Sequence, residues 1–260
     1  VGYSGQCYLS RSLSARSGNR GECSQPCRLP YDLIDAQGHA VVRGKHLLSA
    51  RDLNLADRLS ELIEAGVTSF KIEGRLKDTG YVRNVVAYYR QRLDEVIASR
   101  GDCCRTSAGE TQPDFTPDPS KSFTRGESEY LLAGRQSGLA SFDTPKSVGE
   151  FVGRVARCDS RSFTLDRDAT LAPGDGICIG AAGANINSVE GRRVVPNRMP
   201  GGIRLGAEVF RNLDNSFRMQ LERSRMRRVI PVTAFVEVTP ERIVFRYVDC
   251  EGVTAEALRE

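Results

Sequence analysis

The sequence predicts a mixed α+β protein in which helix–strand–helix units near the amino end are followed by a β-rich barrel or sandwich. Three observations support this class. Helical periodicity dominates residues 50–97, turn-forming residues fill 101–122, and short alternating runs follow from Phe123. With 260 residues, 40% of them hydrophobic, the chain can bury one large core or two modest ones.

The first hundred residues contain the predicted helices. Residues 31–35 and 40–43 flank a turn signal and predict a hairpin. Apolar side chains at helical spacing predict one helix over 50–65, which Gly66 ends, and a second over 81–97. Between them, the short apolar run 67–72 predicts a strand. Helix, strand and helix in this order are typical of βα units in a parallel sheet or barrel.

The composition changes at residues 101–122, which include three prolines and few apolar residues. This stretch predicts a linker, and it divides the chain into domains at 1–100 and 123–260. Beyond it, alternating segments predict a small β-barrel or sandwich followed by the beginning of another β unit. The predicted strands are 150–155, 162–165, 176–179, 232–238 and 242–247.

Composition and charge limit the classes of function. No run of 18 apolar residues and no signal-peptide pattern occur, so we expect a cytoplasmic protein without membrane contact. Eight cysteines in a chain of this length predict free or metal-bound thiols in a reducing compartment. Residues 1–100 hold 15 Lys and Arg against 11 Asp and Glu, a surplus of four, and the remainder is balanced at 22 each. The surplus is compatible with RNA but does not demonstrate binding.

The stretch around which the chain is organised holds Cys7, Cys23 and Cys27 with the spacing C-x15-C-x3-C. Its Gly-, Ser- and Arg-rich composition cannot form a core, so a metal or an iron–sulfur cluster is expected to hold it. Two alternatives remain: packed free thiols, and zinc, although no second knuckle follows the pair Cys23 and Cys27.

Hydrolytic machinery is sparse. His39 and His46 are the only histidines, and no G-x-S-x-G or HExxH motif occurs, which leaves few members for a Ser–His–Asp or Cys–His site. The densest basic run, 218–228, contains five arginines and could either contact RNA phosphates or form a solvated face.

Three ordered motifs carry a family resemblance: YSGQCYLS at 3–10, NRGECSQPCR at 19–28 and FKIEGR at 70–75. They are similar to the collagenase-like peptidase family, family U thirty-two, which also contains enzymes that hydroxylate RNA pyrimidines. Within it the first two motifs most resemble the branch that hydroxylates cytidine in large-subunit ribosomal RNA. The resemblance is strong over 2–97, and 120–260 resembles the β-rich insertion domain of longer members.

The resemblance implies a fold, a cofactor and a co-substrate. The first part would be the carboxyl-terminal portion of a (β/α) TIM-type barrel, and the chain would be a piece of a longer protein. A four-iron cluster would be held by Cys7, Cys23, Cys27 and a fourth cysteine seven positions before Cys7, outside this chain. Some members have a cysteine in the segment that here ends at Asn54. Prephenate would be the co-substrate and ribosomal RNA the partner; no protein partner is predictable.

The motif at 70–75 supplies the expected catalytic residues Lys71, Glu73 and Arg75. They follow a predicted strand, and the carboxyl ends of barrel strands face the active site. An Arg fork there could bind a carboxylate or phosphate, whereas the alternative is an ordinary strand-end ion pair.

Arg16, Arg20 and Arg28 interleave with the cysteines and are the expected substrate-binding residues. Positive charge beside a cluster raises its reduction potential, and arginines also bind anionic substrates or RNA phosphates. The alternative for each is a solvated loop side chain.

Three functions therefore remain in view. The first is an iron–sulfur-dependent RNA cytidine hydroxylase that uses prephenate. The second is a collagenase-like peptidase, and the third is an RNA-binding module without catalysis.

Overall fold

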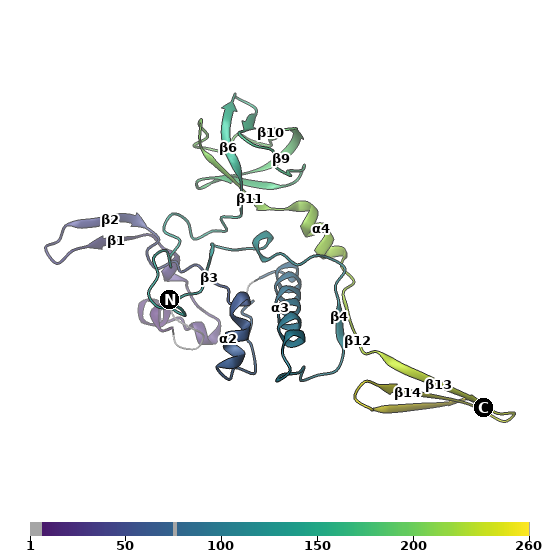
Figure 1. The fold of residues 1–260 in the computed structure, drawn as a ribbon. Helices are drawn as coiled ribbons and strands as arrows, with labels where there is room; N and C mark the ends of the chain where they lie inside the picture. Colours follow the sequence, from purple (N-terminus) through teal and green to yellow (C-terminus); the bar gives the residue numbers. More distant parts are fainter. Residues whose placement is uncertain (1–6, 75–76, 260) are drawn as a thin grey trace.

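The computed structural model describes residues 7–74 and 77–259, and these form a mixed α+β structure with a closed barrel (Figure 1). The amino-terminal part contains short helical turns and an antiparallel hairpin, β1–β2. Its elements are α1 (Leu9–Ser14), η1 (Gly18–Arg20), η2 (Pro26–Arg28), β1 (Tyr31–Ile34), β2 (Ala40–Lys45), β3 (Asp52–Leu53), η3 (Ala56–Arg58) and α2 (Leu59–Glu64). The hairpin is the one predicted for 31–43, with its turn stabilised by Asp35, whose Oδ1 accepts from the N–H groups of Gln37 and His39.

The longest helix, α3 (Thr79–Ser99), confirms the periodicity of 81–97. Asp78 caps it by accepting a hydrogen bond from the N–H of Tyr81 at 2.7 Å. Its buried Ala87 packs with Phe115 and with Phe217 and Leu221 of α4 (Asn215–Arg223). Segments far apart in the sequence therefore share one small core beside α3.

Residues 101–122 contribute to this core. They contain β4 (Glu110–Gln112), η4 (Pro119–Lys121) and the buried Phe115. β4 pairs antiparallel with β12 (Arg227–Val229). The segment that composition predicts to be a linker is thus paired and packed, although the domain boundaries themselves stay a prediction.

A closed barrel of six strands follows, in the order β10-β7-β6-β11-β8-β9. This confirms the predicted β-rich barrel. Its strands are β6 (Glu150–Cys158), β7 (Phe163–Leu165), β8 (Gly176–Ile179), β9 (Ala182–Glu190), β10 (Arg193–Pro196) and β11 (Glu208–Leu213). Alternate apolar side chains point inward, and Ile177, Val194 and Val209 are fully buried there. Closure leaves none of these six strands with an open edge.

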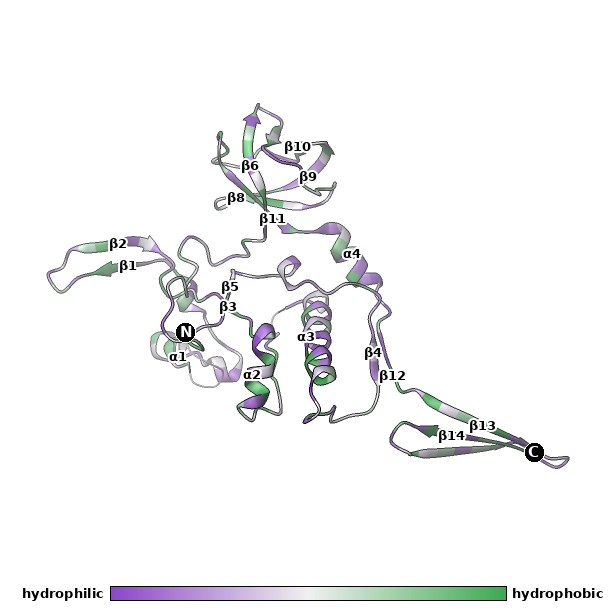
Figure 2. Cartoon of the chain, viewed as in Figure 1, coloured by the Kyte–Doolittle hydropathy of each residue, from purple (hydrophilic) through white to green (hydrophobic). Residues whose placement is uncertain are grey.

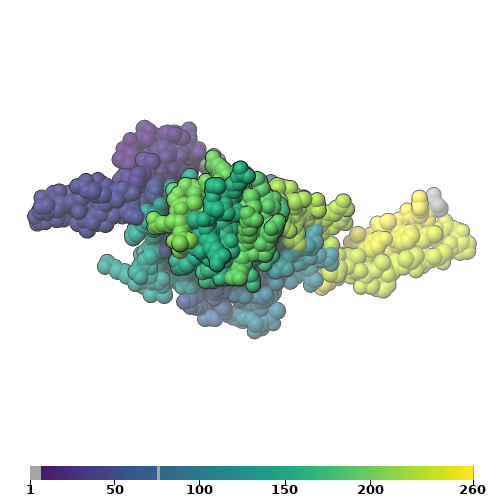
Figure 3. All heavy atoms as spheres, turned by 90° about the horizontal axis from the view of Figure 1, so that it is seen from above, coloured from purple at the N-terminus to yellow at the C-terminus, as the bar shows by residue number. Residues whose placement is uncertain are grey.

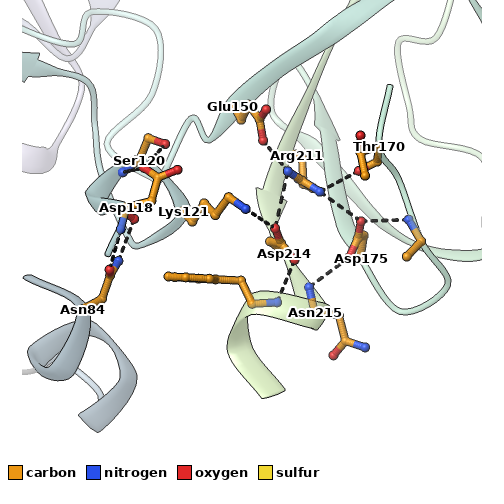
Figure 4. A network of polar contacts seen from close by, with 12 residues as sticks. Asn84, Asp118, Ser120, Lys121, Glu150, Thr170, Asp175, Arg211, Asp214 and Asn215 are labelled. Carbon is orange, nitrogen blue, oxygen red and sulfur yellow. Dashed lines mark hydrogen bonds and ion pairs between the residues drawn. The ribbon is translucent and has the colours of Figure 1, made fainter. Parts of the chain in front are cut away.

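A buried polar network joins the barrel to the helical part (Figure 4). Arg211 on β11 is 8% exposed; it donates to the carbonyl of Thr170 at 2.7 Å and to Glu150, and lies 3.6 Å from Asp175 and 3.4 Å from Asp214. Asp214 caps α4 through the N–H of Phe217 and also pairs with Lys121 of η4 at 3.1 Å. One guanidinium therefore connects barrel strands to the helix that packs on α3.

The carboxyl-terminal part is a three-stranded antiparallel sheet of β13 (Val232–Val238), β14 (Ile243–Asp249) and β15 (Thr254–Arg259). This is the further β unit expected from 232–238 and 242–247. Viewed from above, the sheet and the β1–β2 hairpin extend from opposite sides of the barrel (Figure 3). Hydrophobic residues of β13 are exposed along this projecting sheet (Figure 2).

Two predicted elements differ from the structure. The strand predicted at 67–72 is wrong, because residues 67–74 form no helix or strand. The predicted helix over 50–65 is confined to η3 and α2, and Gly66 ends it at a φ of +91°. Within the described ranges, the one parallel pairing joins β3 to β5 (Glu127–Ser128), so a (β/α) barrel is not seen there.

Candidate functional site

Serine hydroxyls hold the cysteine-bearing segment together. The hydroxyl of Ser10 on α1 lies 3.0 Å from that of Ser24 and also accepts the Ser24 N–H at 2.9 Å. Further along, Tyr31 donates its hydroxyl to the carbonyl of Pro26 at 2.7 Å. Pro26 is buried, so η2, with Cys27 and Arg28, is fixed against the start of the hairpin.

The three thiols differ in environment. Cys7 and Cys27 are half-buried, Cys23 is exposed, and none of the three forms a disulfide. A hydrogen bond from the backbone of Leu9 lowers the pKa of the Cys7 thiol, while Cys23 accepts the N–H of Gln25 at 3.3 Å.

The placement of the three thiols can be compared with what a metal ion or an iron–sulfur cluster requires. Across 7–74 and 77–259 no group of three His, Cys, Asp or Glu side chains is placed to bind a single metal ion. A four-iron cluster holds its thiolates further apart than a single ion does, and free thiols are the ligand type that it takes. The donor chemistry of Cys7, Cys23 and Cys27 fits such a cluster, and the assignment stays a prediction.

Two arginines from distant segments meet beside Cys27. Arg28 donates to the hydroxyl of the buried Ser49 at 2.9 Å and to the carbonyl of Ala50 at 3.1 Å. Arg125 donates to the same carbonyl at 3.3 Å. The parallel pairing of β3 with β5 delivers Arg125, which precedes β5, to the side of Asp52 on β3. Asp52 accepts both the backbone N–H of Arg125, at 2.8 Å, and its guanidinium.

A third cation, Lys77, completes what we call the cation cluster: Arg28, Lys77 and Arg125. The ammonium of Lys77 lies 3.3 Å from the ring centre of Phe123 and 5.2 Å from that of Tyr81. The guanidinium of Arg125 lies 5.4 Å from the same Phe123 ring. An aromatic ring shared by two cations holds both without neutralising them.

Burial and mutual repulsion disfavour the charged forms of Lys77 and Arg125. Burial lowers the pKa of Lys77, and the neighbouring Arg125 and Arg28 lower it further against the opposing pull of Asp52. Burial likewise lowers the pKa of Arg125 and raises that of Tyr130, which is also influenced by the charges of Arg28, Asp52 and Arg125. Positive charge therefore exceeds negative charge at this place, since Asp52, the carboxylate paired with Arg125, stands beside three cations.

The backbone at this site is also unusual. Tyr130 has a φ of +52° and Gln25, which precedes Pro26, a φ of +54°. Side-chain-bearing residues rarely adopt this left-handed conformation, and such outliers concentrate at functional sites. Gln25 directly precedes η2, which carries Arg28, and Tyr130 follows β5, the strand that Arg125 precedes.

The residues predicted from sequence are distributed unevenly. Of the predicted catalytic and substrate-binding residues that the structure describes, only Arg28 joins the cation cluster. Lys71 and Glu73 are exposed and form an ion pair with each other at 2.9 Å, and Arg75 lies outside the described residues. Arg16 and Arg20 are exposed, Arg16 in a loop and Arg20 at the end of η1. Their catalytic and substrate-binding roles stay predictions.

Sequence reasoning missed Lys77, Asp52, Arg125 and Tyr130. Lys77 follows the FKIEGR motif by two residues, and this was the one available signal. No periodicity or spacing marks the other three, because a pairing between chain segments some 73 residues apart brings them together.

The histidines form no hydrolytic arrangement in the described part of the chain. His39 is exposed and contacts Asp35 at 3.3 Å. The Nδ1 of His46 lies 2.8 Å from the carbonyl of Arg28, which fixes the backbone of η2. Neither ring contacts a Ser or Cys side chain there, and this weakens the peptidase reading.

Comparison with known proteins decides the family. The sequence profile of peptidase family U32 matches residues 1–140, more than half of the chain. The chain belongs to this family. It is 41% identical, over 98% of its length, to the 23S rRNA 5-hydroxycytidine C2501 synthase of Escherichia coli, and covers 41% of that protein.

Other members of peptidase family U32 carry different names. The chain is 40% identical over 67% of its length to tRNA hydroxylation protein P1 of Bacillus subtilis, covering 43% of that protein. It is 35% identical over 35% of its length to a collagenase of Porphyromonas gingivalis, covering 25% of it. The chain thus spans about two fifths or less of the length of these relatives. No solved structure matches it.

Proposed function

We propose that this chain is part of an RNA hydroxylase that adds oxygen to a cytidine ring of large-subunit ribosomal RNA. The relative that is similar over nearly the whole chain is named for that product, and a second relative is named for tRNA hydroxylation. The remainder of the longer protein would complete a (β/α) barrel around α2 and α3. A ribosomal RNA substrate places the activity in the cytoplasm.

One observation carries the proposal: Cys27 and Arg28 share the short turn η2, so a thiol and the cation cluster lie side by side. Cys7, Cys23 and Cys27, with one cysteine from outside this chain, would hold a four-iron cluster. When bound, such a cluster transfers single electrons to or from a small molecule. Redox chemistry and anion binding would then meet at one place.

Prephenate, the proposed co-substrate, carries two carboxylates, and the cation cluster is suited to them. Arg28 and Arg125 present guanidinium groups that bind carboxylates in a fork, and Lys77 adds a point charge. Bound carboxylate would raise the depressed pKa of Lys77 by supplying the missing negative charge. Tyr81 and Tyr130 offer hydroxyl donors at the same place.

The cluster assignment is tested in the full-length protein reconstituted anaerobically with iron and sulfide. We expect Cys7→Ala, Cys23→Ala and Cys27→Ala each to reduce bound iron and the broad visible absorbance of the cluster. Cys104→Ala, an exposed cysteine outside the segment, is the control. Unchanged iron in all three variants would refute the ligand assignment.

The anion site is tested by measuring prephenate affinity calorimetrically. Arg28→Gln and Lys77→Met should each weaken binding about 10- to 100-fold, the effect of losing a hydrogen bond to a charged group. Arg161→Gln on an exposed barrel turn is the matched control. Equal affinity in all variants would remove the cation cluster from the proposal, and gelatin cleavage without RNA hydroxylation would favour the peptidase alternative.

A further inference from the structure

A groove of about 1310 Å³ runs between the barrel and the segment 138–149. One wall is formed by that segment together with Arg51 and residues 124–126. The other is formed by the turn between β8 and β9 and by residues 201–212. Arg125, a member of the cation cluster, also lines the groove, so the groove leads to the candidate site.

The charges along the groove are unequally neutralised. Its two carboxylates are already paired, Asp143 with Lys45 and Glu208 with Arg154. By contrast, Arg51, Lys146 and Arg204 form no ion pair within the described part of the chain, and all three are exposed. The groove therefore carries a surplus of three positive charges directed at solvent, which attracts a polyanion.

The glycines and the exposed aromatic ring of the groove indicate which class of polyanion it would bind. Eight glycines line the groove, and a Cβ added at Gly180, Gly202 or Gly206 would meet nothing within 4 Å. The backbone is consequently bare and accessible to a ligand that approaches closely. Phe142, 50% exposed, lies beside Lys146 in the segment 138–149. A positively charged groove with an exposed aromatic ring is the combination that binds single-stranded nucleic acid, the ring stacking on a base.

We propose that this groove binds a single-stranded segment of the RNA substrate, with phosphates on Arg51, Lys146 and Arg204 and a base stacked on Phe142. The inference rests on the proposed function and adds the path of the substrate to it. The basic run 218–228 is less suited, because Arg218 pairs with Glu222 and Arg228 donates to the carbonyls of Ser107 and Ala108. Part of its charge is therefore already used inside the protein.

The test measures binding of a labelled single-stranded RNA of about 12 nucleotides to the 260-residue chain over a range of KCl concentrations. The triple variant Arg51→Gln, Lys146→Gln, Arg204→Gln should lower the slope of log K against log salt by about 2, since each phosphate contact contributes about 0.7. The control replaces Arg157, Arg161 and Arg242 by Gln; these are exposed and form no ion pair in the described part, so the net charge changes equally.

Phe142→Ala gives an independent reading. It should weaken binding about tenfold while leaving the salt slope unchanged, because a stacked ring contributes no counterion release. Thermal melts by circular dichroism establish that each variant is folded, and surface substitutions of this kind alter stability little.

The possible outcomes distinguish a failure of the groove proposal from a failure of the proposed hydroxylase function. The groove proposal is overturned if the triple variant and its control have equal slopes of log K against log salt, or if the wild-type chain binds no RNA. If the groove variants lose RNA affinity as expected but the full-length protein hydroxylates no cytidine, the groove stands and the proposed function falls. If hydroxylation is present and the groove variants bind normally, the function stands, and the groove is open to a protein partner instead.

Discussion

Two cysteines show how the local environment sets thiol chemistry in this chain. The Leu9 backbone hydrogen bond lowers the pKa of Cys7, whereas burial alone raises that of Cys178. Cys178 lies on β8, and its thiol faces the carbonyl of Val148 at 3.5 Å.

The two pKa shifts give a pH prediction at the residue scale. A lowered pKa leaves more thiolate at neutral pH, so alkylation of Cys7 by iodoacetamide should reach half its plateau rate below the ordinary thiol pKa. Alkylation of Cys178 should do so above it, because burial disfavours its thiolate. Peptide mass spectrometry over a pH series measures both rates in one sample. Coincident pH profiles would contradict the assigned environments.

At the scale of elements, the entry into β6 depends on a glycine. Gly149 has a φ of +79°, and a Cβ there would lie 2.1 Å from the carbonyl oxygen of Arg211 on β11. Strand and neighbouring backbone can approach this closely only without a side chain.

Gly149→Ala should therefore destabilise the chain by about 3 kcal/mol or more, combining positive-φ strain with displacement of β11. Gly191→Ala is the matched control: its φ is also positive, at +59°, but the added methyl meets nothing within 4 Å. It should cost only about 1 kcal/mol. Urea denaturation measures the free energy of unfolding of both variants. Similar losses would show that the close approach to Arg211 does not contribute to the cost.

A second element-scale prediction concerns Asn84 on α3, which is fully buried. Its amide donates to the carbonyl of Asp118 at 2.7 Å, and its carbonyl accepts the Asp118 N–H at 2.8 Å (Figure 4). The same amide donates to the hydroxyl of Ser122 at 2.7 Å. Asn84→Ala should cost about 2 to 3 kcal/mol, because the Asp118 N–H loses its partner and the Asp118 carbonyl keeps only the N–H of Lys121, at 3.2 Å. Gln91→Ala, exposed on the same helix, should change stability by less than about 0.5 kcal/mol.

For the whole molecule, Arg211 determines how the barrel is joined to the helical part. Its partners Asp175 and Asp214 are buried, so removing the guanidinium takes away the cation beside Asp175 and leaves Asp214 with Lys121 alone. Arg211→Met should cost about 3 to 5 kcal/mol of unfolding free energy. Arg154→Met removes an exposed pair with Glu208 on the adjoining strands and should cost less than about 1 kcal/mol.

Calorimetry of these two variants also reports cooperativity. If Arg211 couples the barrel to α4 and α3, its loss should broaden or split the thermal transition, whereas the Arg154 variant keeps the wild-type profile. A single sharp transition at the wild-type temperature for Arg211→Met would contradict this role. Within the described ranges, no helix has the length and apolarity needed to cross a bilayer.

The sequence by itself determined the hairpin over 31–43, the helix α3, three of the six barrel strands (β6, β7 and β8) and the family, because alternation, helical periodicity and short motifs are local properties. It did not determine the run 67–74, whose apolar content resembles a strand but which finds no pairing partner among the described residues. Only the tertiary structure decided the order in which the barrel closes and the meeting of Arg28, Lys77 and Arg125 beside Cys27. Strand pairing between distant segments sets both, and no local pattern encodes which segments will pair.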